Sequence, residues 1–451
     1  MRSESAQETL GQSEASNAGL PPSKGWHKTF SALRNPNYRF FYSGQTVSLI
    51  GTWTRTAALG WVAFQVTQSE FLLGIVFMLN SLPIFLFAVY SGSLADRIPK
   101  IRIFTFTSWF SLISSLTLAI MLFRGPVHIA YLMTFSVLWG LSTTFEMPSR
   151  QTLMVELVGK KDLVNAIALN SAMVNSTRVI GPAIGGLLLG SVGAAWCFLL
   201  DAMSYLAVLY AIHKIQLPPS HYSPKKVKAD LKYTLEGFKY LKTNSAIAQT
   251  ITLLFIMGIG GWAYQSQLSA FAVTQLNMDA QGYGWLLALN GLGACTAALF
   301  VASQGSRIVI VKTLFIGAAI YGTFIILFGF MHQPIGAAFL LFFAGFGIIL
   351  FFSIGNSIIQ TQSPDHLRGR LMGIWALVFG GGLPIGSFWM GLVASHTSSG
   401  FSLQIGGLFC LLGAFSVYWF FKKMTPLAGS PATVVSKQPL EDGRKNVHKF
   451  T

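Results

Sequence analysis

The feature that most constrains this chain is where its positive charges fall relative to its apolar stretches. About twelve stretches are long enough to cross a bilayer, since a transmembrane helix needs roughly 20 mostly apolar residues. Of the 31 Lys and Arg residues, only Arg124 lies in a connection on one side, and only Arg55 and Arg178 lie deep inside a stretch. Lys and Arg concentrate in cytoplasmic connections. The pattern therefore predicts a polytopic inner-membrane protein with both termini in the cytoplasm.

The predicted spans form two sets of six, separated by a polar, Lys-rich connection at 215–245. The first six fall near 38–64, 71–95, 103–123, 129–150, 163–190 and 195–214, and the second six near 246–273, 282–303, 313–330, 334–360, 371–394 and 401–421. Secondary transporters that rock two bundles about a central site share this plan. We therefore expect an all-α integral membrane protein with twelve transmembrane helices. Its expected parts are a disordered cytoplasmic tail at 1–34, bundles at 35–214 and 246–422, and a second cytoplasmic tail at 423–451.

The composition excludes several classes of function. Only 10% of the residues are charged, and the net charge is +16. In a soluble protein that charge would suggest nucleic acid, but here the basic residues line the predicted cytoplasmic face, where anionic lipids attract them. The sequence has no nucleotide-binding loop, metal-ligand cluster or nucleophile triad. We therefore expect no enzyme activity, cofactor, metal or nucleic-acid partner.

Five motifs, in order and at matching topological positions, resemble the major facilitator superfamily. GSLADRIPKIR at 92–102 is similar to its motif between spans two and three, with Pro99 where glycine is common. FEMPSRQ (145–151), NAIALNS (165–171), TRVIGPAIGG (177–186) and SPDHLRGRLMGIW (363–375) resemble the subgroup that contains the enterobactin exporters and macrolide efflux proteins. The resemblance covers roughly 35–422 and implies the major facilitator fold.

The resemblance also implies a conformational latch at the cytoplasmic turn after span two. Asp96 would latch the two bundles in the outward-facing state, beside Arg97 and Arg102. Glu146 and Arg150 stand at i,i+4 spacing, which places them on one helical face. They are either part of this latch or a local ion pair at the membrane edge.

Span five carries closely spaced small residues. Gly181 and Gly185 are four apart, Gly186 begins a second such pair, and Pro182 bends the span. The motif predicts close helix packing, and the resemblance associates it with exporters.

Ionisable residues inside spans are functional candidates by default because they are expensive there. Counting along the alternating spans puts Arg55, Arg178 and Asp201 in the middle-to-outer part of the bilayer and Glu146 nearer the cytoplasm. Asp201 is the first candidate for a proton carrier, with Arg55 and Arg178 as its coupling partners. The alternative is a permanent structural ion pair between Asp201 and one of these arginines.

The second half offers polar and aromatic groups, which suit a large amphipathic ligand. The predicted substrate-binding residues are Trp262, Gln265, Trp285, Asn290, Tyr321 and Asn356. The leading interpretation is a proton-coupled exporter of small amphipathic molecules, such as a siderophore or a drug. The alternatives are an importer on the same fold and a non-transporting sensor or lipid-handling scaffold. The expected partners are a small-molecule substrate, protons and membrane lipids, with the chain acting as a monomer.

Overall fold

A computed structural model describes residues 31–216, 239–241, 243–304 and 310–424, and it contains no strand within these ranges. The helices of the first half are η1 (Ser31–Arg34), α3 (Pro36–Thr67), α4 (Glu70–Arg97), α5 (Lys100–Arg124), α6 (Ile129–Ser191) and α7 (Ala194–Lys214). Those of the second half are α9 (Ser245–Ile256), η2 (Met257–Gly261), η3 (Trp262–Ser266), α10 (Leu268–Thr274), α11 (Ala280–Gln304), α12 (Ile310–Gly329), α13 (Pro334–Gln362), α14 (Asp365–His396) and α15 (Ser399–Met424).

The described helices are consistent with the twelve predicted spans. Ten of them are long and apolar enough to cross a membrane. The remaining two predicted spans correspond to α3 and the first part of α6, whose hydropathy is lowered by polar residues such as Gln45, Arg55 and Glu146. The fold is that of an all-α integral membrane protein.

Predicted spans four and five are joined without a loop. The residues on both sides of Gly159 are helical, but Gly159 itself is not, with φ at 66°, so α6 consists of two helices that meet at a kink. A side chain would strain that conformation, whereas glycine adopts it freely. The segment expected as a connection is therefore helical, with a kink.

Predicted span seven is interrupted in its middle. Helix α9 gives way to a π-helical turn, η2, and then to a 3-10 turn, η3, before α10 resumes. Three glycines in η2 weaken the α-helix, and the backbone there approaches α14 and α15: a Cβ on Gly258 would lie 3.2 Å from the Cα of Gly382. Such π turns are frequent at functional sites.

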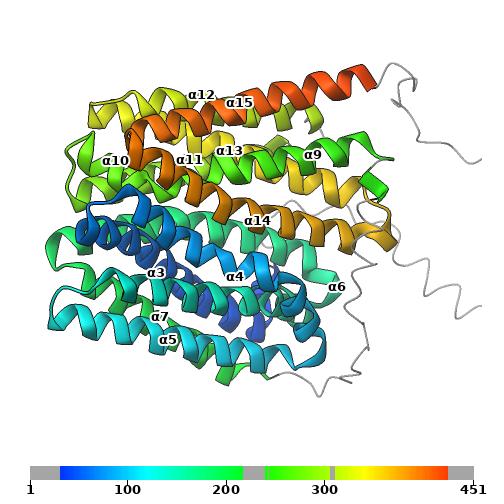
Figure 1. Ribbon diagram of the computed structural model, residues 1–451. Coiled ribbons are helices and arrows are strands. Elements are labelled where there is room, and N and C mark those ends of the chain that lie inside the picture. The colour runs from blue at the N-terminus through cyan, green and yellow to red at the C-terminus, as the bar shows by residue number, and fades with distance from the viewer. Residues whose placement is uncertain (1–30, 217–238, 242, 305–309, 425–451) are drawn as a thin grey trace, which may run out of the picture.

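The helices form two groups that lie one above the other in Figure 1, α3–α7 below and α9–α15 above. The groups meet mainly where α4 packs on α14 and where α6 packs on α11. We call the end of the molecule where α3 begins and α15 ends the tail end, at the right of Figure 1, and the opposite end the far end.

Glycines along α4 and α14 show that the two groups touch at the far end and part towards the tail end. A Cβ on Gly74 would lie 2.6 Å from the carbonyl oxygen of Ser387 and 2.9 Å from the Cα of Gly391. Gly92 and Gly373 lie 18 residues from Gly74 and Gly391, which is five turns of 3.6 residues, so they share the same faces. A Cβ on either would meet nothing within 4 Å.

The first described residues of the chain are tied to α6 just after its kink. The hydroxyl of Ser31 donates to Asp162 at 2.8 Å, and the backbone N–H of Ala32 donates to the side chain of Asn165 at 3.0 Å. These four residues, Ser31–Arg34, were expected in the disordered tail and instead form a 3-10 helix, because α6 supplies their hydrogen-bond partners. The rest of that tail, most of the 215–245 connection and residues 425–451 lie outside the described residues.

Candidate functional site

A buried ion pair joins α3 to α7 in the first bundle. Nη1 of Arg55 lies 3.5 Å from Oδ2 of Asp201, whose side chain is wholly buried, and Arg55 is 5% exposed. Close packing brings the two together: a Cβ on Gly51, one turn before Arg55, would lie 3.0 Å from the Cα of Asp201. Of the two arginines that the sequence offered to Asp201, the structure pairs it with Arg55.

Two residues of neighbouring helices complete the surroundings of this pair. The hydroxyl of Ser115 on α5 donates to Oδ2 of Asp201 at 2.6 Å, and the indole N–H of Trp139 on α6 donates to Ser115 at 3.1 Å. The Arg55 guanidinium lies 4.3 Å from the centre of the Trp139 ring, where the π-electrons attract a cation. Oδ1 of Asp201 is buried without a hydrogen-bond partner in the described part of the chain. One carboxylate oxygen is thus held on both sides and the other is unused.

A second acidic group lies nearer the tail end. Glu146 on α6 pairs with Arg150 one turn later, with 3.5 Å between Oε1 and Nη1. Glu146 is also close enough to Gln45, Arg55 and Asp201 to interact with each. The structure therefore contains the local Glu146–Arg150 pair, and it places this pair in electrostatic reach of the Arg55–Asp201 pair.

Arg178 stands apart from both pairs. Its guanidinium lies 5.1 Å from the ring centre of Trp53 on α3 and 5.0 Å from that of Trp262 on η3, so it is held between indoles of the two bundles. Its Nε is buried without a hydrogen-bond partner among the described residues. The structure does not bring Arg178 to Asp201, its predicted partner.

A small cavity lies beside Arg178, between the bundles. Its volume is about 20 Å³, room for about one water molecule. The lining residues come from α3, α4, α6, η3 and α11: Trp53, Thr56, Ala57, Phe77, Arg178, Pro182, Gln265, Tyr283, Leu287 and Asn290. Two predicted substrate-binding residues, Gln265 and Asn290, are thus brought to one place. A third, Trp262, does not line the cavity but contacts Arg178, which does.

The other predicted substrate-binding residues lie elsewhere. Tyr321 is fully buried and its hydroxyl donates to the carbonyl of Gly261, so it supports the interrupted span. Asn356 accepts a hydrogen bond from Gln360 in the tail-end half of α13. Trp285 is 64% exposed on α11 and does not line the cavity.

The predicted packing glycines face two different neighbours. Gly181 faces α3, where a Cβ would lie 2.4 Å from Cβ of Trp53, and its carbonyl accepts a hydrogen bond from Thr54 at 2.9 Å. Gly185 lies on the same side, where a Cβ would lie 3.3 Å from the carbonyl oxygen of Thr54. Gly186 faces the other bundle, where a Cβ would lie 2.5 Å from the Cα of Gly284. With Pro182 in the cavity wall, the motif serves packing both within and between the bundles.

The predicted latch lies at the tail end of α4 and α5. Arg97 and Arg102 are exposed, and Lys100 between them pairs with Glu156 of α6 at 2.9 Å. The side chain of Asp96 lies outside the described part of the structure. The described contacts thus tie the turn after α4 to α6 of the same bundle.

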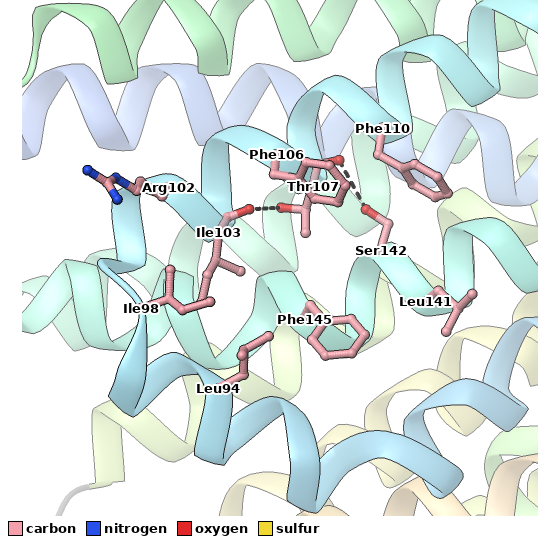
Figure 2. A pocket seen from close by; sticks show the side chains of 10 residues that line it. All are labelled: Leu94, Ile98, Arg102, Ile103, Phe106, Thr107, Phe110, Leu141, Ser142 and Phe145. Atoms are coloured by element: carbon pink, nitrogen blue, oxygen red, sulfur yellow. Dashed lines mark hydrogen bonds between the residues drawn. The ribbon is translucent and has the colours of Figure 1, made fainter. Parts of the chain in front are cut away.

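A groove of about 510 Å³ opens beside this turn, between α4, α5 and α6 (Figure 2). Its walls are aliphatic and aromatic, with Arg102 at one end. The hydroxyl of Thr107 donates to the carbonyl of Ile103 at 3.0 Å, and that of Ser142 donates to the carbonyl of Thr107 at 3.1 Å. Because these hydroxyls are occupied, the groove presents an almost purely apolar surface.

Comparison with known protein families gives one match that covers most of the chain. The family model described as "Transmembrane secretion effector" matches residues 27–442. The chain belongs to this family of the major facilitator superfamily.

Members of the superfamily with curated names resemble the chain over most of their length. It is 26% identical to the staphyloferrin A transporter of Staphylococcus aureus over 370 residues, which is 79% of this chain and 89% of that protein. It is 26% identical to the enterobactin exporter EntS of Shigella flexneri over 406 residues, 86% of this chain and 94% of that one. The chain is therefore a transporter of a superfamily that handles small molecules.

Solved structures show the same fold. The nucleoside transporter NupG superposes with a TM-score of 0.71 at 12% identity, over 85% of this chain and all of that one (100%). A bacterial homologue of the human lysosomal transporter Spinster, inward-facing and unoccupied, superposes with a TM-score of 0.69 at 15% identity, over 92% and 100%. The chain thus has the major facilitator fold that the motifs implied.

Sequence reasoning missed several residues around the buried charges. Ser115, Trp139 and Trp53 contact Asp201, Arg55 or Arg178, and none was a candidate. One signal was present: Ser111, Ser114 and Ser115 interrupt the apolar run of span three. Nothing in the sequence marked either tryptophan, because aromatic residues are common throughout the apolar stretches.

Proposed function

We propose that this transporter is a proton-coupled exporter of small amphipathic molecules, first of all of siderophores, and that it works by alternating access as a monomer. The observation that carries the proposal is the divergence of α4 and α14: their glycines touch at the far end and face open space at the tail end. Interfaces between packed helices tend to have two discrete arrangements. A reciprocal arrangement, closed at the tail end, would complete the cycle.

The geometry of Asp201 supports proton coupling. Oδ2 accepts a hydrogen bond from Ser115 and lies 3.5 Å from Nη1 of Arg55, while Oδ1 has no donor among the described residues, so a proton can bind Oδ1 without displacing a hydrogen bond. Protonation would remove the negative charge that Arg55 needs. Glu146 lies within electrostatic reach on the tail-end side, which makes a relay between the two carboxylates the natural route.

The choice of cargo rests on the relatives, which are named for staphyloferrin A and enterobactin. The test measures the siderophore content of the medium and of the cytoplasm for cells with and without the gene. An exporter leaves more siderophore in the medium and less in the cytoplasm, and everted vesicles accumulate it when a proton gradient is imposed. Uptake into intact cells instead would identify an importer, the alternative function on this fold.

The next prediction concerns the orientation of the protein in the membrane. The tail end carries the basic residues, so we propose that it faces the cytoplasm. A cysteine introduced at Pro126, exposed at the far end, should react in intact cells with a membrane-impermeant maleimide, whereas one at Thr243, exposed at the tail end, should react only after lysis. The parent protein, which has three native cysteines, is labelled in the same way to measure the background reaction. The opposite pattern would invert the topology and the direction of transport.

A latch at the turn after α4 is also part of the proposal, with Asp96, Arg97, Arg102, Glu146 and Arg150 as its members. We expect Asp96→Asn to leave the protein inserted and folded but to slow transport several-fold, because a contact made in only one state biases the equilibrium between states. Transport rate and membrane level are measured together. The matched control is Asp279→Asn, an acidic residue in the far-end connection before α11, and transport at the wild-type rate in Asp96→Asn would refute the latch.

A further inference from the structure

Arg178 has a setting that the coupling proposal does not use. Its guanidinium lies between Trp53 of one bundle and Trp262 of the other, at 5.1 Å and 5.0 Å from the ring centres. Two aromatic faces attract a cation and partly replace the water that it has lost. They do not neutralise its charge.

Within the described part of the chain, no carboxylate pairs with Arg178. None of the ion pairs in the described ranges involves Arg178, and its buried Nε has no hydrogen-bond partner there. Arg55, at a similar depth, is by contrast paired with Asp201. A charge inside the membrane that lacks its counter-ion is expensive, and such residues mark substrate or ion pathways.

Arg178 lies where the two bundles are in contact. A Cβ on Gly291 of α11 would lie 2.6 Å from the carbonyl of Arg178, so the bundles touch at its backbone. Its side chain borders the cavity of about 20 Å³ with Gln265 and Asn290. Trp262 and Gln265 belong to the interrupted span, and irregular backbone within a membrane is tolerated where it lines a binding site.

We propose that Arg178 is the anion-binding residue of the cargo site, and that the cargo carries a carboxylate or phenolate group on an aromatic or apolar body. The acidic oxygens would bind the free edge of the guanidinium, beside the Gln265 amide. In this conformation the cavity has room for about one water molecule, so it can take an acidic oxygen, and the rest of the cargo lies on the tail-end side. There it meets Trp262, which packs edge-on against Phe352 at 5.1 Å and Phe379 at 5.7 Å. The inference rests on the proposed function and names the cargo class.

The test compares two probes of one shape, salicylate and its neutral amide, salicylamide, on the full-length protein in detergent. Binding is followed by the shift of the thermal unfolding midpoint with ligand concentration. We expect salicylate to bind about tenfold or more tightly than salicylamide, as a charge-assisted hydrogen bond implies. The preference should vanish in Arg178→Gln and persist in Arg124→Gln, which removes the same charge at the far end.

Should Arg178→Gln fail to fold, the comparison of the two probes on the wild-type protein and on Arg178→Lys still decides. Equal binding of acid and amide by the wild type, or no binding of the acid, overturns the inference. A preference that survives in Arg178→Gln also overturns it. These binding results do not depend on transport. If the protein binds salicylate through Arg178 but exports no siderophore, only the proposed function is refuted. If it exports siderophore but shows no preference for salicylate, only this inference is refuted.

Discussion

Asp201→Asn should abolish the response of transport to a pH gradient and should lower the stability of the folded protein. Asparagine keeps the size of the side chain and its bond with Ser115 but cannot carry the charge. Arg55, 5% exposed, then loses its counter-ion. Breaking one partner of a buried pair costs about 3–5 kcal/mol. The measurements are the thermal unfolding midpoint of the purified variant and cargo uptake into vesicles with and without a pH gradient.

The double variant Arg55→Met/Asp201→Asn separates the two roles of the pair. It removes both charges, so it should recover much of the stability that Asp201→Asn loses, while pH-driven transport stays absent. Ser115→Ala is the control, since it removes a hydrogen bond to Asp201 but keeps the charge. A stable Asp201→Asn with unchanged pH-driven transport would reject both roles, and Glu146 would become the next candidate for the proton carrier.

Gly186→Val should open the far end and stop transport. Two methyl groups cannot fit where a Cβ alone would lie 2.5 Å from the Cα of Gly284. Overpacking of this kind costs about 1–3 kcal/mol, and every 1.4 kcal/mol changes a population about tenfold. The overpacking destabilises the conformation that is closed at the far end. It does not destabilise a conformation in which α6 and α11 separate there.

A reporter cysteine on the other pair of helices tests this prediction. Ser387 on α14 is 4% exposed and lies against Gly74, so Ser387→Cys should react slowly with a thiol reagent from the far side. In Gly186→Val it should react much faster, because the bundles move as units. The neighbouring Leu187→Val, exposed on the surface of α6, is the control and should leave both labelling and transport unchanged. Slow labelling together with normal transport in Gly186→Val would contradict the expected opening.

The sequence predicted the spans and the buried charges well, because both rest on strong rules. An ionisable residue within a long apolar run is rare, so Arg55, Arg178 and Asp201 could be singled out without a structure. The partner of Asp201 could not be predicted. Arg55 on α3 and Arg178 on α6 lie at a similar depth. Which of them contacts Asp201 depends on which face of each helix packs against α7, and the sequence does not show this.

The aromatic residues show a second limit of sequence reasoning. Trp262 and Trp285 looked equivalent, yet one contacts Arg178 and the other is 64% exposed. In a membrane, the outward face of a helix is as apolar as its packed face, so hydrophobic periodicity does not separate them. The interruption of α9 and the kink at Gly159 were missed for a related reason: glycines are frequent in such helices, and the sequence does not mark which of them breaks the helix.

The bonds between η1 and α6 constrain how the protein is made. Ser31 and Asp162 are 131 residues apart, and Asn35, the N-cap of α3, donates to the carbonyl of Leu157 across 122 residues. The bond of Asn35 cannot form before the fourth span and Leu157 have been synthesised, and the bond of Ser31 also requires Asp162, which follows the kink at Gly159. The segment Ser31–Asn35 can therefore dock on α6 only after four spans have been synthesised, and this docking ties the start of α3 to α6. Truncation of the nascent chain before Leu157 would remove the partners on α6 that both bonds require.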